Sequence, residues 1–587
     1  MIHFEKSIVR AAPCAPVDLP ETLHPVLRRA YALRNLTGAA ELDRSLSCLL
    51  PVSLLNGAAE AAHLLQQMIE SRRKILIVAD FDADGATSCA LALRGLRAMG
   101  AENLDYLVPN RFEYGYGLTP EIVAVASERD PALIVTVDNG VSSLQGIAAA
   151  HAAGIQVLVT DHHLPGPQLP DADVIVNPNM PDNSFPSKHL AGVGVIFYVL
   201  IALRQQMSAS GWFSRMGRHP PNLAELLDLV ALGTVADLVS LDHNNRVLVY
   251  QGLQRMRAGR CCAGIRALAT VAQRSLARLV SSDLGFAIGP RLNAAGRIED
   301  MALGIECLLT DDQDLAEELA ARLDALNRTR RTIGEEMERQ ALEQLDKLPL
   351  IDQLPFGLCL YREEWHQGVI GILAARIREQ CHRPVIAFAP GEEAGLLKGS
   401  ARSVSGLHIR DLLDAIAASH PGLLQKFGGH AMAAGLSLQL TDFDTFRLAF
   451  DREVRRRVDA QQLRGLIRSD GALQPGDFGI ELAELLRAAG PWGQGFSEPV
   501  FDGHFRLLQR RPVAEKHLKL LLQPSEGGDI IDAIAFNQVE RPGEVDSTIH
   551  AAYRLDVNEY RGRHSLQLLI EHFQVVPERI RGNLHGG

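Results

Sequence analysis

The sequence predicts an α/β fold class, in which a domain with a parallel sheet is joined by a long helix to a second α/β domain, followed by a β-barrel domain. The first domain is indicated by short apolar runs that alternate with helical stretches. Continuous apolar runs of this length are typical of parallel strands that are buried on both faces. The runs are KILIVAD (74–80), ALIVTVD (132–138), IQVLVTD (155–161) and DVIVNP (173–178).

The remaining domains follow from two further patterns. A charged stretch of helical period begins at Leu315 and predicts a connecting helix, and a second α/β unit starts near FGLCLYREEW. HFRLLQRRPV and HLKLLLQ lie between Gly and Pro turns, as the strands of a small oligonucleotide-binding (OB) type of barrel do. The predicted divisions are a helical N-terminal leader (1–70), a catalytic domain (71–310), the connecting helix (311–345), the second α/β domain (346–455) and the barrel (465–580).

Composition limits the class of protein. Hydrophobic residues make up 47% and charged residues 22% of the chain, as in globular proteins. The 8 cysteines form no Cys-x-x-Cys pair, which indicates reduced thiols. The N-terminus does not resemble a secretory signal, and no run reaches the ~20 apolar residues of a membrane helix. We therefore expect a cytoplasmic protein without a membrane segment.

The net charge of −11 argues by itself against a nucleic-acid partner. That objection weakens where carboxylates are concentrated in a metal site, because bound cations reverse the local potential. The positions of the acidic residues indicate such a site. Asp and His residues close three of the predicted strands: Asp80, Asp82 and Asp84 after the first, Asp138 after the second, and Asp161, His162 and His163 after the third.

Because ligands bind beyond the carboxyl ends of parallel strands, these side chains are expected to meet at one edge of the sheet. Carboxylates in such proximity repel each other unless cations neutralise them. Oxygen ligands with one or two imidazoles suit Mn2+ or Mg2+, and two such ions ~4 Å apart can support phosphoryl transfer. A single Asp at a strand end is commonly a turn former or helix cap, but the shared edge favours a metal site.

Several motifs resemble a known superfamily. DFDADG, VDNG, TDHH and ALGTVADLVSL occur in the order of the DHH phosphoesterase motifs. GPRLNAAGRIED (289–300), HQGVIGILAARI (366–377), KGSARSVSGLHI (398–409) and FGGHAMAAGLSL (427–438) resemble its bacterial RecJ branch. PWGQGFSEPVF (491–501) resembles the start of the OB domain of that branch. The resemblance implies a DHH domain, a DHHA1 domain and an OB domain in this order.

The resemblance also implies roles for individual residues. Its metal ligands correspond to Asp80, Asp82, Asp84, Asp138, His162 and Asp237. Asp237 is included on the resemblance alone, and Asp80 is either a ligand or an immediate support. His163 is implied to contact the scissile phosphate, which completes the catalytic set, and Asp161 is implied to orient a histidine.

Strand-binding residues are implied in both α/β domains. Ser400 and Arg402, in the turn-prone loop KGSARS, are expected to bind a terminal phosphate, although a solvated loop is the simpler interpretation. Arg111 is expected to contact phosphate, and Tyr114 either stacks on a base or packs in the core. The residues expected to line the channel between the domains are Arg291, Asn293, Arg297 and His430, with interdomain hydrogen bonding as the alternative.

The implied function is a 5′-to-3′ exonuclease that hydrolyses single-stranded DNA to 5′ mononucleotides with two Mn2+ or Mg2+ ions, in DNA repair and recombination. The expected partners are single-strand DNA-binding protein and a helicase, and the chain is expected to be a monomer. Two alternatives stay open. One is a phosphodiesterase for cyclic or very short substrates, and the other is an inactive strand-binding scaffold of replication.

Overall fold

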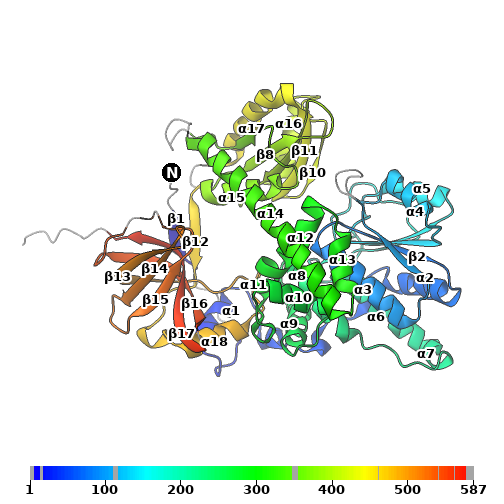
Figure 1. The fold of residues 1–587 in the computed structure, drawn as a ribbon, viewed down its shortest axis with the longest axis horizontal. Coiled ribbons are helices and arrows are strands. Elements are labelled where there is room, and N and C mark those ends of the chain that lie inside the picture. The colour runs from blue at the N-terminus through cyan, green and yellow to red at the C-terminus, as the bar shows by residue number, and fades with distance from the viewer. Residues whose placement is uncertain are drawn as a thin grey trace, which may run out of the picture.

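The computed structural model describes residues 6–576 except 13–16, 110–116, 347–353, 460–461, 540, 542 and 561. A large N-terminal α/β domain, a second α/β domain and a C-terminal barrel are arranged around the long helix α14 (Gln313–Asp346) (Figure 1). The predicted fold class is confirmed in each of these parts.

The sheet of the N-terminal domain consists of parallel strands in the order β3-β2-β4-β5-β6. Their bounds are Leu104–Leu107 (β3), Ile75–Ala79 (β2), Leu133–Val137 (β4), Gln156–Thr160 (β5) and Val174–Val176 (β6). Ala79 pairs with Val137, and Val137 pairs with Thr160. The residues that follow these strands therefore leave the sheet at the same level.

Helices cover both faces of this sheet (Figure 1). One face packs on α2 (Ala58–Glu70), α3 (Ala83–Met99), α6 (Gly192–Ala209) and α8 (Leu227–Ala236), and the other on α4 (Pro120–Ser127) and α5 (Leu144–Ala152). By length and composition, α6 could cross a membrane, and the bent pair 46–54 and 58–70 passes the same test together. However, 67% of the α6 span is buried inside the protein, as in a core helix.

The second α/β domain has the strand order β10-β11-β9-β8-β7, with only β7 and β8 parallel. The strands are Leu358–Tyr361 (β7), Val385–Pro390 (β8), Leu396–Arg402 (β9), Lys426–Gly429 (β10) and Ala433–Gln439 (β11). Helix α15 (Ile370–Cys381) packs with α14 on one face. Helices α16 (Ile409–Ser419) and α17 (Phe443–Arg457) cover the other face.

The prediction that KGSARS is a loop was wrong. These residues form the end of β9, which is paired with β8 on one side and β11 on the other. Gly and Ser have low strand propensity, but the close neighbours on the sheet require a small residue here. A Cβ atom at Gly399 would lie 2.6 Å from the ring of Phe388.

The C-terminal domain is a closed barrel in the order β13-β14-β15-β17-β16. Its strands are Phe501–Val513 (β13), His517–Pro524 (β14), Ile531–Ala535 (β15), Thr548–Tyr560 (β16) and Arg563–Val575 (β17), and α18 (Ile480–Ala489) packs against it. The predicted helical leader contains α1 (Pro25–Ala32) and α2 but also a strand. Strand β1 (Lys6–Arg10) pairs in parallel with β12 (Gly465–Ser469), a partner that no local pattern reveals.

Candidate metal centre

The acidic and histidine residues predicted for the metal site meet at the carboxyl edge of the N-terminal sheet. Their ligand atoms form three overlapping groups, each lying within 4.8 Å. The groups are Asp80, Asp82 and Asp138; Asp84, His162 and Asp237; and Asp138, His162 and His163. Because Asp138 and His162 each belong to two groups, the arrangement offers adjacent positions for cations.

The loop after β2 is folded around its own carboxylates. Asp82 is the N-cap of α3, and its Oδ1 accepts hydrogen bonds from the backbone N–H groups of Asp84 and Gly85. Asp80 Oδ1 accepts one from the backbone of Phe81. Gly85 is required here, because a Cβ atom at this position would lie 2.4 Å from the carbonyl oxygen of Asp80. Capping thus fixes the conformation of the loop that carries these carboxylates.

Two helices deliver the remaining support. At the N-terminus of α6, the backbone N–H groups of Gly192 and Val193 donate to Asp84 at 2.7 and 2.9 Å. Such donors stabilise a carboxylate, as helix N-termini do. Asp237 is the C-cap of α8, and its Oδ2 lies 3.5 Å from His162 Nε2. Tertiary packing of α8 brings Asp237 to the site, so local sequence patterns could not place it there.

Asp138 has a strained backbone. Its φ of +64° lies in the left-handed region, which is uncommon for a residue other than glycine. Its carboxylate is buried, and its Oδ1 lies 3.0 Å from His162 Nε2. Strained residues of this kind gather at functional sites, where the surrounding structure holds them.

The two histidines differ in their hydrogen bonds. His163 Nδ1 lies 2.8 Å from Asp161 Oδ1, which also accepts hydrogen bonds from the backbone of both histidines. His162 Nε2 is buried among the carboxylates, but it makes no hydrogen bond within the described part of the chain. The orienting contact expected of Asp161 is therefore made to His163, while the imidazole of His162 is directed at the acidic cluster.

The protonation equilibria reflect the crowding. Burial, together with the charge of Asp82, raises the pKa of Asp84 to about 7. Burial and neighbouring carboxylates also raise the pKa values of Asp138 and Asp237 well above the ordinary range. In the absence of cations, the cluster thus resists full ionisation.

The histidine pKa values diverge for physical reasons. Burial and the charge of His163 lower the pKa of His162 to about 3, which leaves it neutral and able to donate a lone pair. Burial alone would lower the pKa of His163, but the hydrogen bond and charge of Asp161 outweigh it and raise this pKa to about 9. His163 is consequently cationic at neutral pH.

These features fit divalent cations. Carboxylate oxygens dominate the donor set, with one neutral imidazole, which suits Mn2+ or Mg2+. A Cβ atom at Gly192 would lie 2.7 Å from Asp138 Oδ1, and one at Gly233 would lie 2.8 Å from Asp84 Oδ1. Both glycines therefore keep side chains away from the carboxylate cluster.

The second α/β domain reaches this centre through the β10–β11 hairpin. The ring centroids of His430 and His163 are 6.2 Å apart. Ala433 of the same hairpin pairs with Arg402 on β9. Arg402 is partly buried and donates to Ser400 Oγ at 3.1 Å, and it has no carboxylate partner among the described residues. Burial and the charge of Arg378 lower the pKa of Arg402.

Three of the predicted channel residues lie on helix α12 (Gly289–Ile298), and each makes a different contact. Arg291 is buried and pairs with Asp324 of α14 at 2.8 Å, so its guanidinium joins α12 to α14, and its expected place along the strand channel stays a prediction. Asn293 Oδ1 accepts from the backbone N–H of Ala83 and so supports the metal loop. Arg297 donates to the carbonyl of Gly368 in the second domain, which is the interdomain hydrogen bond considered as the alternative. Arg111 and Tyr114 lie outside the described residues.

Sequence reasoning missed the asparagines that hold the histidine loop. Asn177 donates to the carbonyl oxygen of His163 at 2.8 Å, and Asn179 donates to that of His162 at 2.6 Å. Both follow β6 in the run NPN, and their position after a strand of the same sheet was the available signal.

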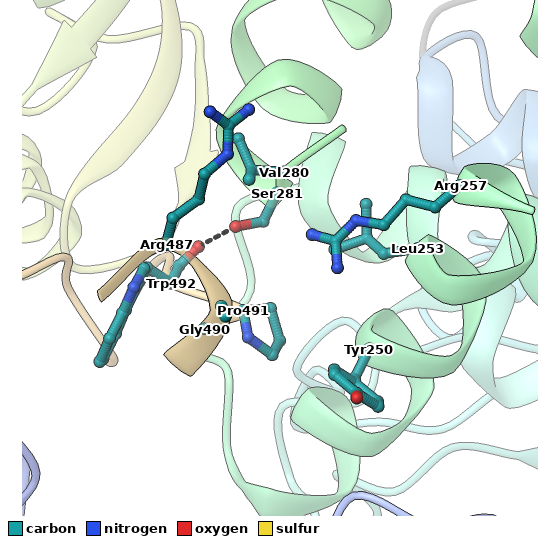
Figure 2. Close-up of a pocket in the computed structure, with 10 residues that line it drawn as sticks. Tyr250, Leu253, Arg257, Val280, Ser281, Arg487, Gly490, Pro491 and Trp492 are labelled. Carbon is teal, nitrogen blue, oxygen red and sulfur yellow. Dashed lines mark hydrogen bonds between the residues drawn. The ribbon is translucent and has the colours of Figure 1, made fainter. Parts of the chain in front are cut away.

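A separate pocket lies between the N-terminal domain and the segment that leads into the barrel. Tyr250, Arg257, Ser281, Arg487 and Trp492 are among its lining residues (Figure 2). Ser281 donates to the carbonyl of Trp492, and Arg487 donates to that of Arg278. These contacts join the two parts of the chain, and none of the predicted site residues lines this pocket.

Sequence comparisons place this architecture among known proteins. The profile of the DHH family, N-terminal domain, matches residues 74–234, the DHHA1 domain matches 355–456, and the RecJ OB domain matches 469–572. A protein of Dickeya dadantii (strain 3937) named single-stranded-DNA-specific exonuclease RecJ is 56% identical over 569 residues, which cover 96% of this chain and 98% of the relative. The chain belongs to the RecJ family.

Further RecJ proteins are also similar to this chain in sequence and in structure. Escherichia coli (strain K12) RecJ is 54% identical over 557 residues, covering 94% of this chain and 96% of the relative. The crystal structure of RecJ in complex with Mn2+ from Thermus thermophilus has a TM-score of 0.76 at 30% identity, covering 96% of this chain and 77% of that one. The corresponding complex with Mg2+ has a TM-score of 0.71 at 28% identity, covering 94% of this chain and 75% of that one.

Proposed function

We propose that the chain is a metal-dependent exonuclease that degrades single-stranded DNA from 5′ to 3′ and releases 5′ mononucleotides. The observation that carries this proposal is the convergence of the predicted carboxylates and His162 at one sheet edge. The names and metal complexes of its RecJ relatives support the same activity. An inactive scaffold has no need for so costly a concentration of buried acids.

Two Mn2+ or Mg2+ ions would be held by the predicted ligand set, in which Asp138 belongs to two of the three groups of ligand atoms. Bound there, they would supply Lewis-acid stabilisation of phosphate charge and a lowered pKa for water. The residues proposed as ligands are Asp80, Asp82, Asp84, Asp138, His162 and Asp237.

The chain's own groups then position the phosphate. His163 is held by Asp161 and cationic at neutral pH, so it can donate a charge-assisted hydrogen bond to a non-bridging oxygen. Asn177 and Asn179 fix the backbone of the histidine loop, which limits the directions in which this imidazole can point. His163 therefore acts in binding and charge stabilisation.

The second domain is proposed to hold the 5′ end. Arg402 and Ser400 lie on one face of β9, and a guanidinium with no carboxylate partner among the described residues suits a terminal phosphate. Gly371, in the first turn of α15, allows close approach, because a Cβ atom there would lie 2.9 Å from Arg402 and 3.0 Å from Ser400. The barrel would provide a second binding surface for the DNA strand.

A time course on a single strand labelled at either end tests this function. With Mn2+ or Mg2+, a 5′ label is expected to appear at once as mononucleotide, while a 3′ label persists on progressively shorter strands. The opposite order, or equal release in chelator, would refute the proposal. Comparison with a dinucleotide tests the alternative of a phosphodiesterase for short substrates, which would prefer the shorter compound.

The cellular role is likewise proposed by family. The chain is expected to act as a monomer in the cytoplasm, in DNA repair and recombination, with a helicase and single-strand DNA-binding protein supplying and covering the strand. The described cysteines are free thiols, as this compartment favours.

A further inference from the structure

Phe286 is the most exposed of the large hydrophobic residues in the described part of the chain. Its relative exposure is 76%, whereas the aromatic residues of the cores are almost entirely buried. An exposed phenylalanine contributes little to folding through burial, and its ring is accessible to a ligand.

The position of Phe286 is set by a π-helix, Leu284–Ile288, which runs directly into α12. Glycines on both sides let this segment pack on the last turn of α8. A Cβ atom at Gly285 would lie 3.3 Å from Val235, and one at Gly289 would lie 3.0 Å from Ala236. The next residue of α8 is Asp237, so the π-helix lies against the element that carries this proposed ligand.

Helix α12, which continues from the π-helix, contacts the metal loop through residues closer to its C-terminal end. Asn293 hydrogen-bonds to Ala83, and Arg297 to Gly368 across the domain boundary. Phe286, Asn293 and Arg297 are spaced by seven and four residues, which places them on roughly the same side of the helix. Phe286 therefore lies on the face of this segment that carries the contacts to the metal loop and to the second domain.

Leu238 follows directly after Asp237 in the chain. It is 61% exposed, and its φ of +60° is in the left-handed region. A branched, apolar side chain is disfavoured in that conformation, and such strain persists where the surroundings require it. Two exposed apolar residues thus belong to segments that meet at the last turn of α8, where Asp237 follows.

We propose that Phe286 and Leu238 form a platform for an unpaired nucleobase of the strand whose phosphate lies at the metal centre. This inference rests on the proposed function. Every base has a π-face, so stacking is independent of sequence. In a duplex both faces of an internal base are covered by the neighbouring base pairs, so only a single strand can present a free base face to the platform. The platform therefore contributes to selectivity for single strands.

Tryptophan at this position provides a direct test. The Phe286→Trp variant gains tryptophan fluorescence at this position. A thymidine oligonucleotide is added stepwise to this variant in a buffer that contains Ca2+ in place of an activating metal, and the added fluorescence is expected to be quenched. An oligonucleotide with abasic sites near its 5′ end is expected to quench it far less. Equal quenching by both strands, or none by either at saturating concentrations, would overturn the platform.

Kinetics supply an independent test on the full chain. Phe286→Ala is expected to lower kcat/KM on single-stranded DNA about tenfold, mainly through KM, in the range found for removal of a base-stacking ring. The abasic strand is expected to be a poorer substrate than the normal strand for the wild type, and the difference is expected to shrink in Phe286→Ala. Leu448→Ala is the control, since it removes another exposed apolar side chain on the outer helix α17.

The outcomes separate the two proposals. If the wild type releases no nucleotides from any single strand, the proposed function fails. If the wild type is active but Phe286→Ala discriminates against abasic strands as strongly as the wild type does, only the nucleobase platform fails. A lowered kcat/KM with unchanged abasic discrimination would assign Phe286 to another contact and would also overturn the platform.

Discussion

Asp138 illustrates how a single residue links the fold to the site. It follows β4, has a left-handed backbone conformation and lies 3.0 Å from His162. Its strand-end position was predictable from the apolar run before it. Its proximity to Gly192 was not, because Gly192 begins α6, which comes more than fifty residues later in the chain.

Asp138→Ala is predicted to reduce nuclease activity by at least about 1000-fold, because several kcal/mol of Lewis-acid stabilisation would be lost with the ions it shares. Nucleotide release and bound manganese should be measured on the same sample. Asp444→Ala, which alters an exposed carboxylate on α17, is the control and is expected to behave as the wild type. An Asp138→Ala protein with nearly full activity and metal content would contradict the ligand assignment.

Asp161→Asn is predicted to lower kcat about 10- to 100-fold, the range found when a supporting partner of a site residue is lost. The loss of its charge lowers the pKa of His163, which is now raised to about 9 despite burial. The alkaline limb of the pH–rate profile should therefore move to lower pH. An unchanged profile in the variant would show that protonated His163 is not needed.

At the scale of elements, the register of the sheet explains the site. β2, β4 and β5 end level with one another, so their following residues converge. Apolar runs ending in Asp predicted this convergence well. The same local reasoning mistook β9 for a loop, because Gly399 and Ser400 belong to a strand on account of their neighbours. It also missed β1, whose partner β12 is hundreds of residues away in the chain.

Arg402 on strand β9 leads to a prediction about recognition of the 5′ end of the DNA. Arg402→Ala is expected to reduce kcat/KM on a 5′-phosphorylated strand about 10- to 100-fold, with a much smaller effect on a 5′-hydroxyl strand, since a charge-assisted hydrogen bond contributes about 1.5–3 kcal/mol. Arg402→Lys should recover only part of the loss, because lysine lacks the guanidinium fork. Equal losses on both strands would argue against recognition of a terminal phosphate.

At the scale of the whole molecule, the metal centre links the binding of protons and cations to the free energy of unfolding. The pKa values of Asp84, Asp138 and Asp237 are raised in the folded chain, so folding favours their protonated forms. The unfolding free energy therefore falls as pH rises through the folded pKa values. His163 acts in the same direction, since its stabilisation is complete below its unfolded pKa of about 6.5 and is lost as pH passes about 9.

The metal-free protein is accordingly predicted to have a lower Tm at about pH 8 than at about pH 6.5, measured by differential scanning calorimetry in chelator. Added Mn2+ should raise Tm more at the higher pH, where fewer protons compete for the carboxylates. In Asp138→Asn, both the pH slope and the response to Mn2+ should be smaller. A Tm that rises with pH in chelator would contradict the repulsion assigned to this cluster.

Carboxylates from separate strands and helices meet at one edge of the sheet because, as we propose, divalent cations hold them together. Anomalous scattering from a crystal soaked in Mn2+ is the decisive measurement. We predict two manganese peaks on either side of the Asp138 carboxylate, with His162 and Asp237 among the ligands. Strong nuclease activity in the same preparation, with no manganese at this edge of the sheet, would contradict the proposal.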